Sequence, residues 1–337
     1  FSETVVKIQR VGAKSKQRPG SYSPRFSFAY IHGEASRHLN ASISGNTSST
    51  YRLGLNRFRQ FRLEYGLNSD WPPQLEHIMQ FIASLSLHGL SASTARIYVA
   101  SIGFQCKILG YEDVTKQFVI SKMLEGIKRS KTRSDCRLPI TPSLLSNILL
   151  KLPAVCTNVY ETILFSAAYS LAFFGFLRVG ELTASKRQNL SSTLCVNDIN
   201  LIQESNTLIV SLRFSKTDQE GKGERLQIST QGGHICPVKN VKEFLSMRPK
   251  MQGPFFCNFD GSPLTRYQFS AVLSKALAVQ SLSHMCFKSH SFRIGAATTA
   301  ASLGMTDKEI KLAGRWSSDA YKGYVRSPTR MIPKLIR

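Results

Sequence analysis

Residues 288–295 read Lys-Ser-His-Ser-Phe-Arg-Ile-Gly, and a Gly-Arg-Trp at 314–316 and then Tyr324 follow them. This pattern predicts a short helical run with His290 and Arg293 one turn apart, a tight turn, and a last helix that presents a tyrosine. Residues three apart lie on one helix face, so the pair can address one small target. The set suits a phosphodiester: a guanidinium binds phosphate oxygens bidentately, imidazole can shuttle a proton, and tyrosine can be a covalent nucleophile.

The composition is that of a basic globular protein. The chain has 337 residues, 42% of them hydrophobic and 19% charged, which favours about two domains and excludes a disordered chain. Its formal net charge is +23, and the excess runs from Arg10 to Arg337 instead of gathering in one tail. A charge this large exceeds what solubility needs and indicates a polyanion as partner, most often nucleic acid.

The cysteines and the apolar runs exclude other classes. The seven cysteines are scattered and form no Cys-x-x-Cys pair, so we expect neither a zinc site nor a disulfide framework, and we expect a reducing compartment. The longest apolar run, 163–177, contains serine and tyrosine and falls short of the ~18 residues of a membrane span, so it predicts a core helix. No secretory signal is recognisable, and the start at Phe1 suggests a fragment of a longer product.

Periodicity and helix breakers divide the chain into four segments. Residues 1–45, rich in Ser, Gly, Lys and Arg, are expected to be a flexible basic arm. Residues 46–130 show helical spacing and predict a compact domain of helices. The basic, non-periodic residues 131–137 are the expected linker, and residues 138–337 the second domain.

The second domain is expected to be mainly helical with a small sheet. A buried helix is predicted over 160–176, and short strands over 194–202, 207–214 and 224–229, the last two joined by a loop at 215–223.

In the first domain, Arg52, Arg59 and Arg62 line up along one side of the first helix. Such a row is more often a solvated face than a DNA contact, although the overall charge of the chain favours contact.

Two further cations, Arg178 and Lys216, are candidate functional residues because of their positions in the predicted elements. Arg178 follows an apolar helix, where a charge needs a partner or a ligand, and Glu181 can be that partner in a structural ion pair. Lys216 lies where a strand enters a loop, which suits either a group that swings to a substrate or a solvated turn lysine.

Taken in order, these residues resemble the tyrosine recombinase (phage integrase) family. The resemblance rests on Gly175-Phe-Leu-Arg178-Val-Gly-Glu181-Leu182, Lys216, His290-Ser-Phe-Arg293, Gly314-Arg315-Trp316 and Tyr324. The Gly-Arg-Trp turn ahead of the tyrosine is similar to that of Crypton and DIRS-like recombinases of eukaryotic mobile elements. Residues 93–98 with Ile102 and Gly110 resemble the family's helical core-binding domain, so the resemblance covers nearly everything after residue 46.

The resemblance implies a two-domain clamp on double-stranded DNA. One lobe would be the helical, SAM-like core-binding domain and the other a mainly helical α+β catalytic domain with a small antiparallel sheet. It implies action as a homodimer or homotetramer on DNA and no membrane association. The tail, residues 331–337, is expected to dock on a neighbouring subunit. The protein would work in the nucleus of a eukaryote, or in the cytoplasm and nucleoid of a prokaryote.

The resemblance also implies a mechanism. Tyr324 would attack a backbone phosphate, form a 3′-phosphotyrosyl link and release a 5′-hydroxyl. Arg178 and Arg293 would hold the non-bridging oxygens and stabilise the developing charge. Lys216 would protonate the leaving oxygen, and His290 would assist proton transfer or hydrogen-bond the phosphate. No metal and no nucleotide cofactor is implied.

Two positions leave alternatives open. The family more often has a single His or Trp directly after the glycine, so either Arg315 or Trp316 can fill the phosphate contact here, and we favour the indole N–H of Trp316. Tyr321 lies one helical turn before Tyr324 on a similar face, but Tyr324 with the Val-Arg after it fits the family better. Glu181 is expected to orient the first arginine without touching DNA.

The implied function is site-specific DNA recombination or integration, as in a mobile element. Two alternatives are a domesticated, catalytically idle DNA-binding protein and a relaxase of the type IB topoisomerase kind, which shares the chemistry without exchanging partners.

Overall fold

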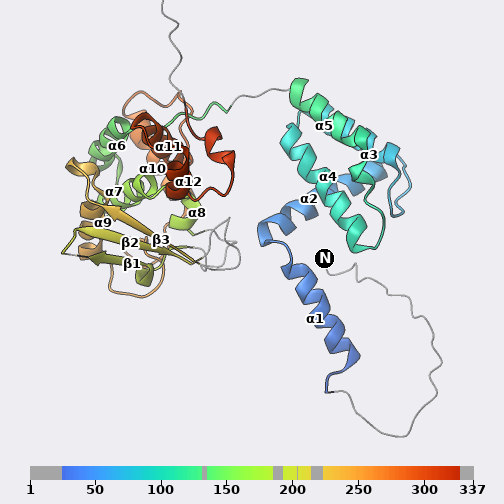
Figure 1. Cartoon of the computed structure of the whole chain (residues 1–337), viewed down its shortest axis with the longest axis horizontal. Helices are drawn as coiled ribbons and strands as arrows, with labels where there is room; N and C mark the ends of the chain where they lie inside the picture. Colours follow the sequence, from blue (N-terminus) through green and yellow to red (C-terminus); the bar gives the residue numbers. More distant parts are fainter. Residues whose placement is uncertain (1–24, 131–134, 185–192, 203, 214–222, 327–337) are drawn as a thin grey trace, which may run out of the picture. The chain divides into compact units, whose positions relative to one another are not determined.

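The computed structural model describes residues 25–130, 135–184, 193–202, 204–213 and 223–326 (Figure 1). The chain divides into two compact units, Phe1–Ser134 and Asp135–Arg337, and each is described by itself.

Unit 1 is entirely helical where it is described. Its elements are α1 (Phe28–Ala41), α2 (Gly45–Glu64), α3 (Leu75–Leu87), α4 (Ala92–Ile108), the 3-10 turn η1 (Val114–Lys116) and α5 (Phe118–Ser130). Ser44 and Ser91 begin α2 and α4 as N-caps, each hydroxyl accepting the backbone N–H three residues on. The core gathers the apolar stripes of α2 to α5, with Phe58, Ile82 and Ile102 fully buried.

The expected flexible arm, 1–45, needs a correction, because residues 28–41 form α1. Ser27 caps this helix by accepting the N–H of Tyr30, and Glu34 pairs with Arg37 one turn later. None of the residues of α1 is buried, so local bonds support the helix. Residues 1–24 of the expected arm lie outside the described residues.

Arg62 belongs to the core of unit 1 and not to an exposed row of arginines. Its guanidinium lies 4.7 Å from the ring of Phe58 and 5.5 Å from that of Trp71. It donates to the carbonyl oxygens of Asn68 and Asp70, at 3.3 and 2.9 Å. Arg62 therefore fastens the loop after α2 to the helix by cation–π contact and hydrogen bonds.

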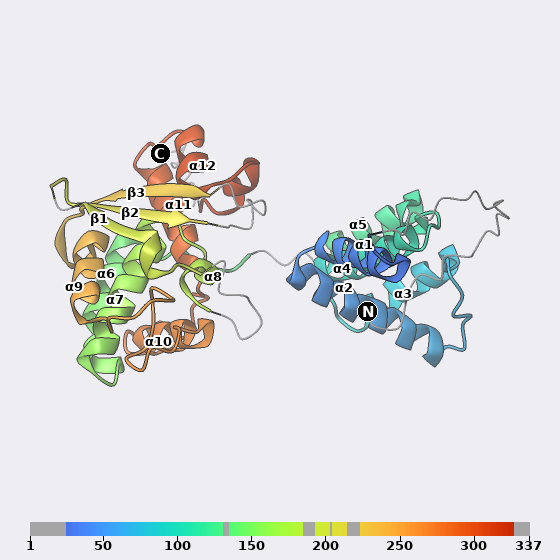
Figure 2. The same cartoon turned by 90° about the horizontal axis from the view of Figure 1, so that it is seen from below.

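Unit 2 contains a small sheet among helices, as predicted. The elements are α6 (Pro142–Val155), α7 (Val159–Phe174), α8 (Val179–Leu182), η3 (Val196–Asp198), β1 (Ile199–Ile202), β2 (Thr207–Leu212), β3 (Glu224–Ser229), η4 (Gly233–Ile235), α9 (Pro237–Met247), α10 (Arg266–Ala278), α11 (Ser291–Ser302), α12 (Asp307–Gly314) and η5 (Asp319–Gly323). The strands pair antiparallel in the order β1-β2-β3 and lie along one side of α7 and α9 (Figure 2). The expected mainly helical fold with a small antiparallel sheet is confirmed.

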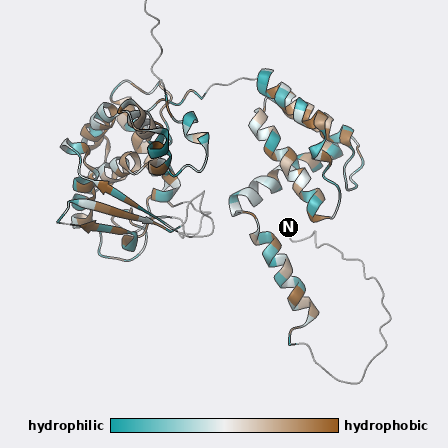
Figure 3. Ribbon diagram, viewed as in Figure 1, coloured by the Kyte–Doolittle hydropathy of each residue, from teal (hydrophilic) through white to brown (hydrophobic). Residues whose placement is uncertain are grey.

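The first strand is shorter than expected. Residues 196–198 form η3, because the carboxylate of Asp198 accepts the N–H of Cys195 and closes a turn before β1 begins. Hydrophobic residues run along the strands (Figure 3), and those of β2 that face the helices are buried.

Helix α7 is the centre of the unit 2 core. Its Tyr169 is fully buried, stacks on Phe292 at 5.1 Å and donates its hydroxyl to the carbonyl of Phe269. These contacts fix α10 and α11 against α7. The backbone of α11 also approaches that of Ile140 closely, since a Cβ on Gly295 would lie 1.8 Å from the carbonyl oxygen of Ile140.

Among the described residues, no helix is long and apolar enough to cross a membrane.

Candidate active site

The corner between α7 and α8 turns a carbonyl toward two guanidiniums. Phe176 has φ 48°, in the left-handed region, so its carbonyl points away from the direction of α7. That oxygen accepts from Nη1 of Arg293 and, at 3.2 Å, from Nη2 of Arg315. Arg178 follows as the first residue of the next turn and is partly buried. The corner thus gathers three arginines that are far apart in the sequence.

Glu181 joins two of these arginines. Its carboxylate accepts the backbone N–H of Arg178 at 2.8 Å, Nη1 of Arg178 at 3.1 Å, and Nη1 and Nη2 of Arg315 at 3.2 and 3.0 Å. Burial raises the pKa of Glu181, but Arg315 first and then Arg178 outweigh it, so the pKa lies below its usual range. Glu181 is therefore ionised and orients Arg178.

Arg315 faces the interior. It follows α12 in the left-handed conformation, with φ 57°, and its side chain is only 2% exposed. Its guanidinium is engaged by Glu181 and by the carbonyl of Phe176. Of the two alternatives for a phosphate contact after the glycine, Arg315 is thus already occupied in a buried ion pair.

Trp316 folds back over the glycine of the same turn. A Cβ on Gly314 would lie 1.6 Å from the indole ring, so only glycine admits this ring position. The ring lies 4.2 Å from the guanidinium of Arg293 and 5.0 Å, centroid to centroid, from the ring of Tyr324. The partly exposed ring of Trp316 therefore packs against both Arg293 and Tyr324.

Arg293 is the most deeply buried cation of the site, at 1% exposure. It donates Nη1 to the carbonyl of Phe176 and Nη2 to that of Gly314. Burial, then Arg178 and Arg315, lower the pKa of Arg293 to about 9. The guanidinium remains charged at neutral pH, but the two neighbouring arginines, Arg178 and Arg315, outweigh the single negative charge of Glu181.

His290 and Tyr324 are in direct contact. His290 precedes the first turn of α11, and its Nε2 lies 2.9 Å from the phenol oxygen of Tyr324. Burial, then Arg137 and Arg293, lower the pKa of His290 to about 4, so the imidazole is neutral at pH 7. A neutral imidazole with its proton on Nδ1 can accept the phenol proton through Nε2.

The last helix differs from the prediction. It is the five-residue 3-10 turn η5, not an α-helix, and Tyr324 follows it as its C-cap. Tyr321 is 2% exposed and packs in a small core with Ala300 and Ile310. The two tyrosines therefore have different surroundings, and only Tyr324 meets the histidine.

The structure brings together Arg178, His290, Arg293, Trp316 and Tyr324. Lys216, the remaining predicted site residue, lies outside the described residues. The roles of all six stay predictions from the sequence at this point.

Sequence reasoning missed one neighbour of the site. Arg137, placed in the expected linker, acts electrostatically on both His290 and Tyr324. Nothing in the sequence signals this, because the segment has no periodicity and its partner residues lie far along the chain.

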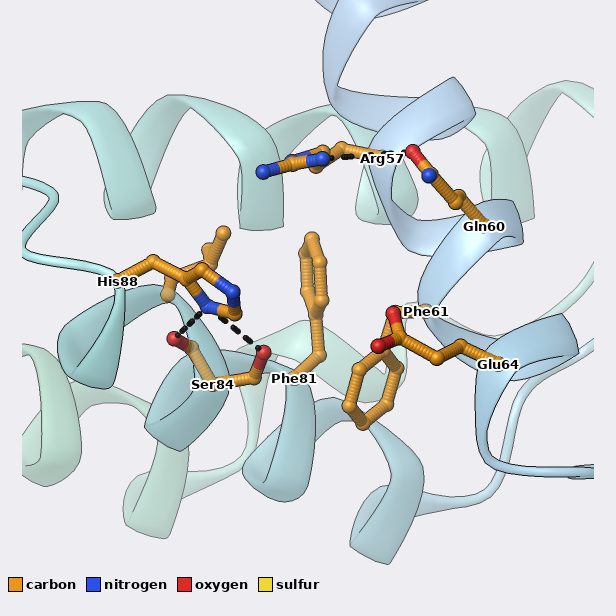
Figure 4. A pocket seen from close by; sticks show the side chains of 8 residues that line it. Arg57, Gln60, Phe61, Glu64, Phe81, Ser84 and His88 are labelled. Atoms are coloured by element: carbon orange, nitrogen blue, oxygen red, sulfur yellow. Dashed lines mark hydrogen bonds between the residues drawn. The ribbon is translucent and has the colours of Figure 1, made fainter.

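A pocket in unit 1 is too small to compete as a functional site. It lies between α2 and α3 (Figure 4) and has a cavity volume of about 30 Å³, room for roughly one water molecule. Its lining comprises Arg57, Gln60, Phe61, Glu64, Phe81, Ser84, Leu85 and His88. His88 is already bonded there, through Nδ1, to the carbonyl oxygen of Ser84 at 2.8 Å.

Across the described ranges, no three His, Cys, Asp or Glu side chains come together as a possible metal-ligand set.

The fold is that of the tyrosine recombinases, two-domain proteins whose catalytic domain is mainly helical with a small sheet. The solved structure of the Tn1549 transposon integrase in complex with circular intermediate DNA is similar, with a TM-score of 0.61 and 16% identity over 89% of this chain and 95% of that one. The XerH site-specific recombinase bound to a palindromic difH substrate has a TM-score of 0.60 and 18% identity over 82% of this chain and 75% of that one. A lambda integrase dimer bound to a COC′ core site has a TM-score of 0.59 and 14% identity, over 91% and 79%.

A relative in sequence agrees with this fold. An integrase/recombinase XerD homolog of Selenomonas ruminantium is 24% identical over 286 residues, which cover 80% of this chain and 77% of the relative. No model of a protein family matches the chain. In sequence and in fold the chain is thus similar to tyrosine recombinases and integrases.

Proposed function

We propose that this chain is a site-specific DNA recombinase or integrase that cuts and rejoins duplex DNA through a 3′-phosphotyrosyl intermediate. The observation that carries the proposal is the 2.9 Å contact between Tyr324 and a neutral His290, beside Arg293 and Trp316. The contact joins a nucleophile, a base and a buried cation in one place, as phosphoryl transfer to a side chain requires.

The charge of the site suits a phosphodiester. The guanidiniums of Arg178 and Arg315 share one buried carboxylate, that of Glu181. Arg293 is buried nearby, and the imidazole of His290 is neutral. A phosphodiester brings one negative charge and gains a second in the transition state of attack. The excess of positive charge therefore favours the transition state over the ground state, which is the requirement for catalysis.

In the proposed reaction the phenol oxygen of Tyr324 attacks the phosphorus, and its proton passes to Nε2 of His290. The bond from phosphorus to the 5′ oxygen breaks, and Lys216 gives that oxygen its proton. Arg178 and Arg293 stabilise the non-bridging oxygens, and Trp316 donates its indole N–H to one of them. A 5′-hydroxyl of the same or another strand reverses the steps. The phosphotyrosine bond keeps the energy of the broken bond, so the scheme includes no metal and no nucleotide cofactor.

The proposed partner is double-stranded DNA, bound by a homodimer or homotetramer. The net charge of +23 supports an affinity that falls steeply with salt. Within the family we place the chain near the Crypton and DIRS-like recombinases of mobile elements, on its Gly-Arg-Trp turn at 314–316. In a eukaryote the site of action would be the nucleus, and in a prokaryote the nucleoid.

The test has two steps. DNA sequences that the protein binds are first enriched from a randomised pool, and nicked duplexes that carry these sequences are then used to trap the covalent adduct. The nick releases a short strand on cleavage and so traps the adduct. We expect an adduct that is lost with Tyr324→Phe and kept with Tyr321→Phe. Salt-sensitive DNA binding without any adduct would identify an idle DNA-binding protein instead. Exchange between two such sites in a plasmid distinguishes a recombinase from a relaxase, which only removes supercoils.

A further inference from the structure

The first residues of unit 2 lie against the loop that leads into α11. The N–H of Leu138 donates to the carbonyl of Cys286 at 3.0 Å, and the N–H of Ile140 donates to that of Ser291 at 3.0 Å. These bonds hold residues 135–140 beside the start of α11, where His290 lies. Asp135, Arg137 and Arg326, which we call the Asp135 cluster, meet at this place.

In the Asp135 cluster one carboxylate holds two arginines. Asp135 accepts Nε and Nη2 of Arg137 at 2.8 and 3.0 Å, and Nη2 of Arg326 at 2.6 Å. Arg326 also donates Nε to the carbonyl of Arg137 at 3.3 Å. The hydrogen bond from Arg137 is the largest influence on Asp135, and its pKa lies well below the usual range. The cluster is therefore ionised and bridges residues 135–137 to residue 326.

Arg326 in turn is fastened to the segment that carries Tyr324. Its Nη1 donates to the carbonyl of Gly323 at 2.5 Å. Its backbone N–H donates to the hydroxyl of Thr298 at 3.0 Å, and that hydroxyl lies 3.3 Å from the carbonyl of Tyr324, to which it donates. Thr298 of α11 thus holds the backbone of Tyr324 and Arg326, and the side chain of Arg326 links the neighbouring Gly323 to Asp135.

We propose that Asp135 is a positioning residue for the nucleophile. By holding Arg326, its carboxylate keeps the short segment after η5 in the place where the phenol of Tyr324 meets His290. The inference rests on the proposed function, in which Tyr324 is the nucleophile. A 3-10 turn of five residues has little stability of its own, so the position of the residue after it depends on such contacts. Asp135 is the first residue of unit 2, so the start of this unit takes part in positioning the nucleophile.

The test compares Asp135→Asn, Arg326→Gln and the double variant in the adduct assay. With saturating DNA, each single variant is expected to form adduct about tenfold more slowly, while the DNA dissociation constant stays within about twofold. The double variant should be no slower than either single one, because both remove the same interaction. A reversed pair, Asp135→Arg with Arg326→Asp, should recover part of the rate. The matched control is Glu125→Gln, which breaks the exposed Lys122–Glu125 pair of unit 1 and should leave the rate unchanged.

A second readout needs no DNA. The chain has two tryptophans, so in a Trp71→Phe background the fluorescence comes from Trp316, whose ring lies 5.0 Å from that of Tyr324. Asp135→Asn should shift this emission, and Glu125→Gln should not. If the unchanged protein forms adduct and Asp135→Asn forms it as fast, with the same emission, the positioning role is wrong while the proposed function stands. If the unchanged protein forms no adduct but the emission shifts, the proposed function fails and the contact between Asp135 and the segment of Tyr324 stands.

Discussion

Replacing Glu181 by glutamine is expected to lower the free energy of unfolding of unit 2 by about 3–5 kcal/mol at pH 7. Glutamine keeps the shape of the side chain but removes the charge that four N–H groups share, at 2.8 to 3.2 Å. The loss falls chiefly on Arg315, whose side chain is 2% exposed, since Arg178 at 19% can still reach water. A buried guanidinium without its counter-charge costs this much because solvent cannot replace the carboxylate.

Equilibrium unfolding in urea measures the effect, and the fluorescence of the one tryptophan in each unit reports on the unfolding of that unit. Trp71 lies in unit 1 and Trp316 in unit 2, so Trp71→Phe leaves a single reporter of the unit concerned. The matched control is Glu224→Gln. That carboxylate lies 3.9 Å from Nε of Arg315 but is 43% exposed, and its loss should change the free energy by less than about 0.5 kcal/mol.

A paired replacement separates lost charge from lost packing. Glu181→Met combined with Arg315→Met removes both charges and leaves apolar side chains, so it should be more stable than Glu181→Gln alone. If the unfolding free energy of Glu181→Gln lies within about 0.5 kcal/mol of that of the unchanged protein, Glu181 is not the group that neutralises the buried Arg315.

Three further predictions concern other parts of unit 2. Gly295→Ala should lower its unfolding free energy by about 2 kcal/mol or more, since the added Cβ would lie 1.8 Å from the carbonyl oxygen of Ile140; an unchanged urea midpoint would contradict this packing. Cys136 and Cys286 have sulfur atoms 3.0 Å apart, so oxidation by diamide should join them within one chain with the loss of two hydrogen masses; a peptide map that still shows both thiols free after treatment would count against their contact. His290 has a pKa of about 4, below the ordinary 6.5, so the unfolded chain takes up a proton on this histidine first as the pH falls. The free energy of unfolding should therefore fall by about 1–3 kcal/mol between pH 6.5 and pH 4, and His290→Asn should remove this pH dependence. Equal slopes of unfolding free energy against pH for the two proteins would show that His290 has an ordinary pKa.

The sequence predicts the parts of the fold that depend on local pattern. Apolar spacing and serine caps locate most helices, and a run rich in β-branched residues locates β2. The placement of His290 and Arg293 three residues apart at the start of one helix follows from helical spacing alone, with His290 as the N-cap of α11 and Arg293 in its first turn. These features need no knowledge of which segments meet in space.

The remaining features depend on contacts between distant segments. The left-handed conformation of Arg315 has no signal in the sequence, because a residue other than glycine adopts it only when its surroundings compensate, here through Glu181. The different surroundings of Tyr321 and Tyr324 depend on how η5 packs against α11 and α12. Asp135 reads as a linker residue until its partner, Arg326, is seen beside it.

The central claim is that the phenol of Tyr324 becomes bonded to DNA. Trypsin cuts after Lys322, so Tyr321 and Tyr324 fall into different peptides, and mass spectrometry of a trapped complex digested with trypsin and nuclease can tell them apart. The account predicts a nucleotide on the peptide Gly323–Arg326 and none on the peptide that contains Tyr321. A nucleotide on Tyr321, or on any residue other than Tyr324, would contradict it.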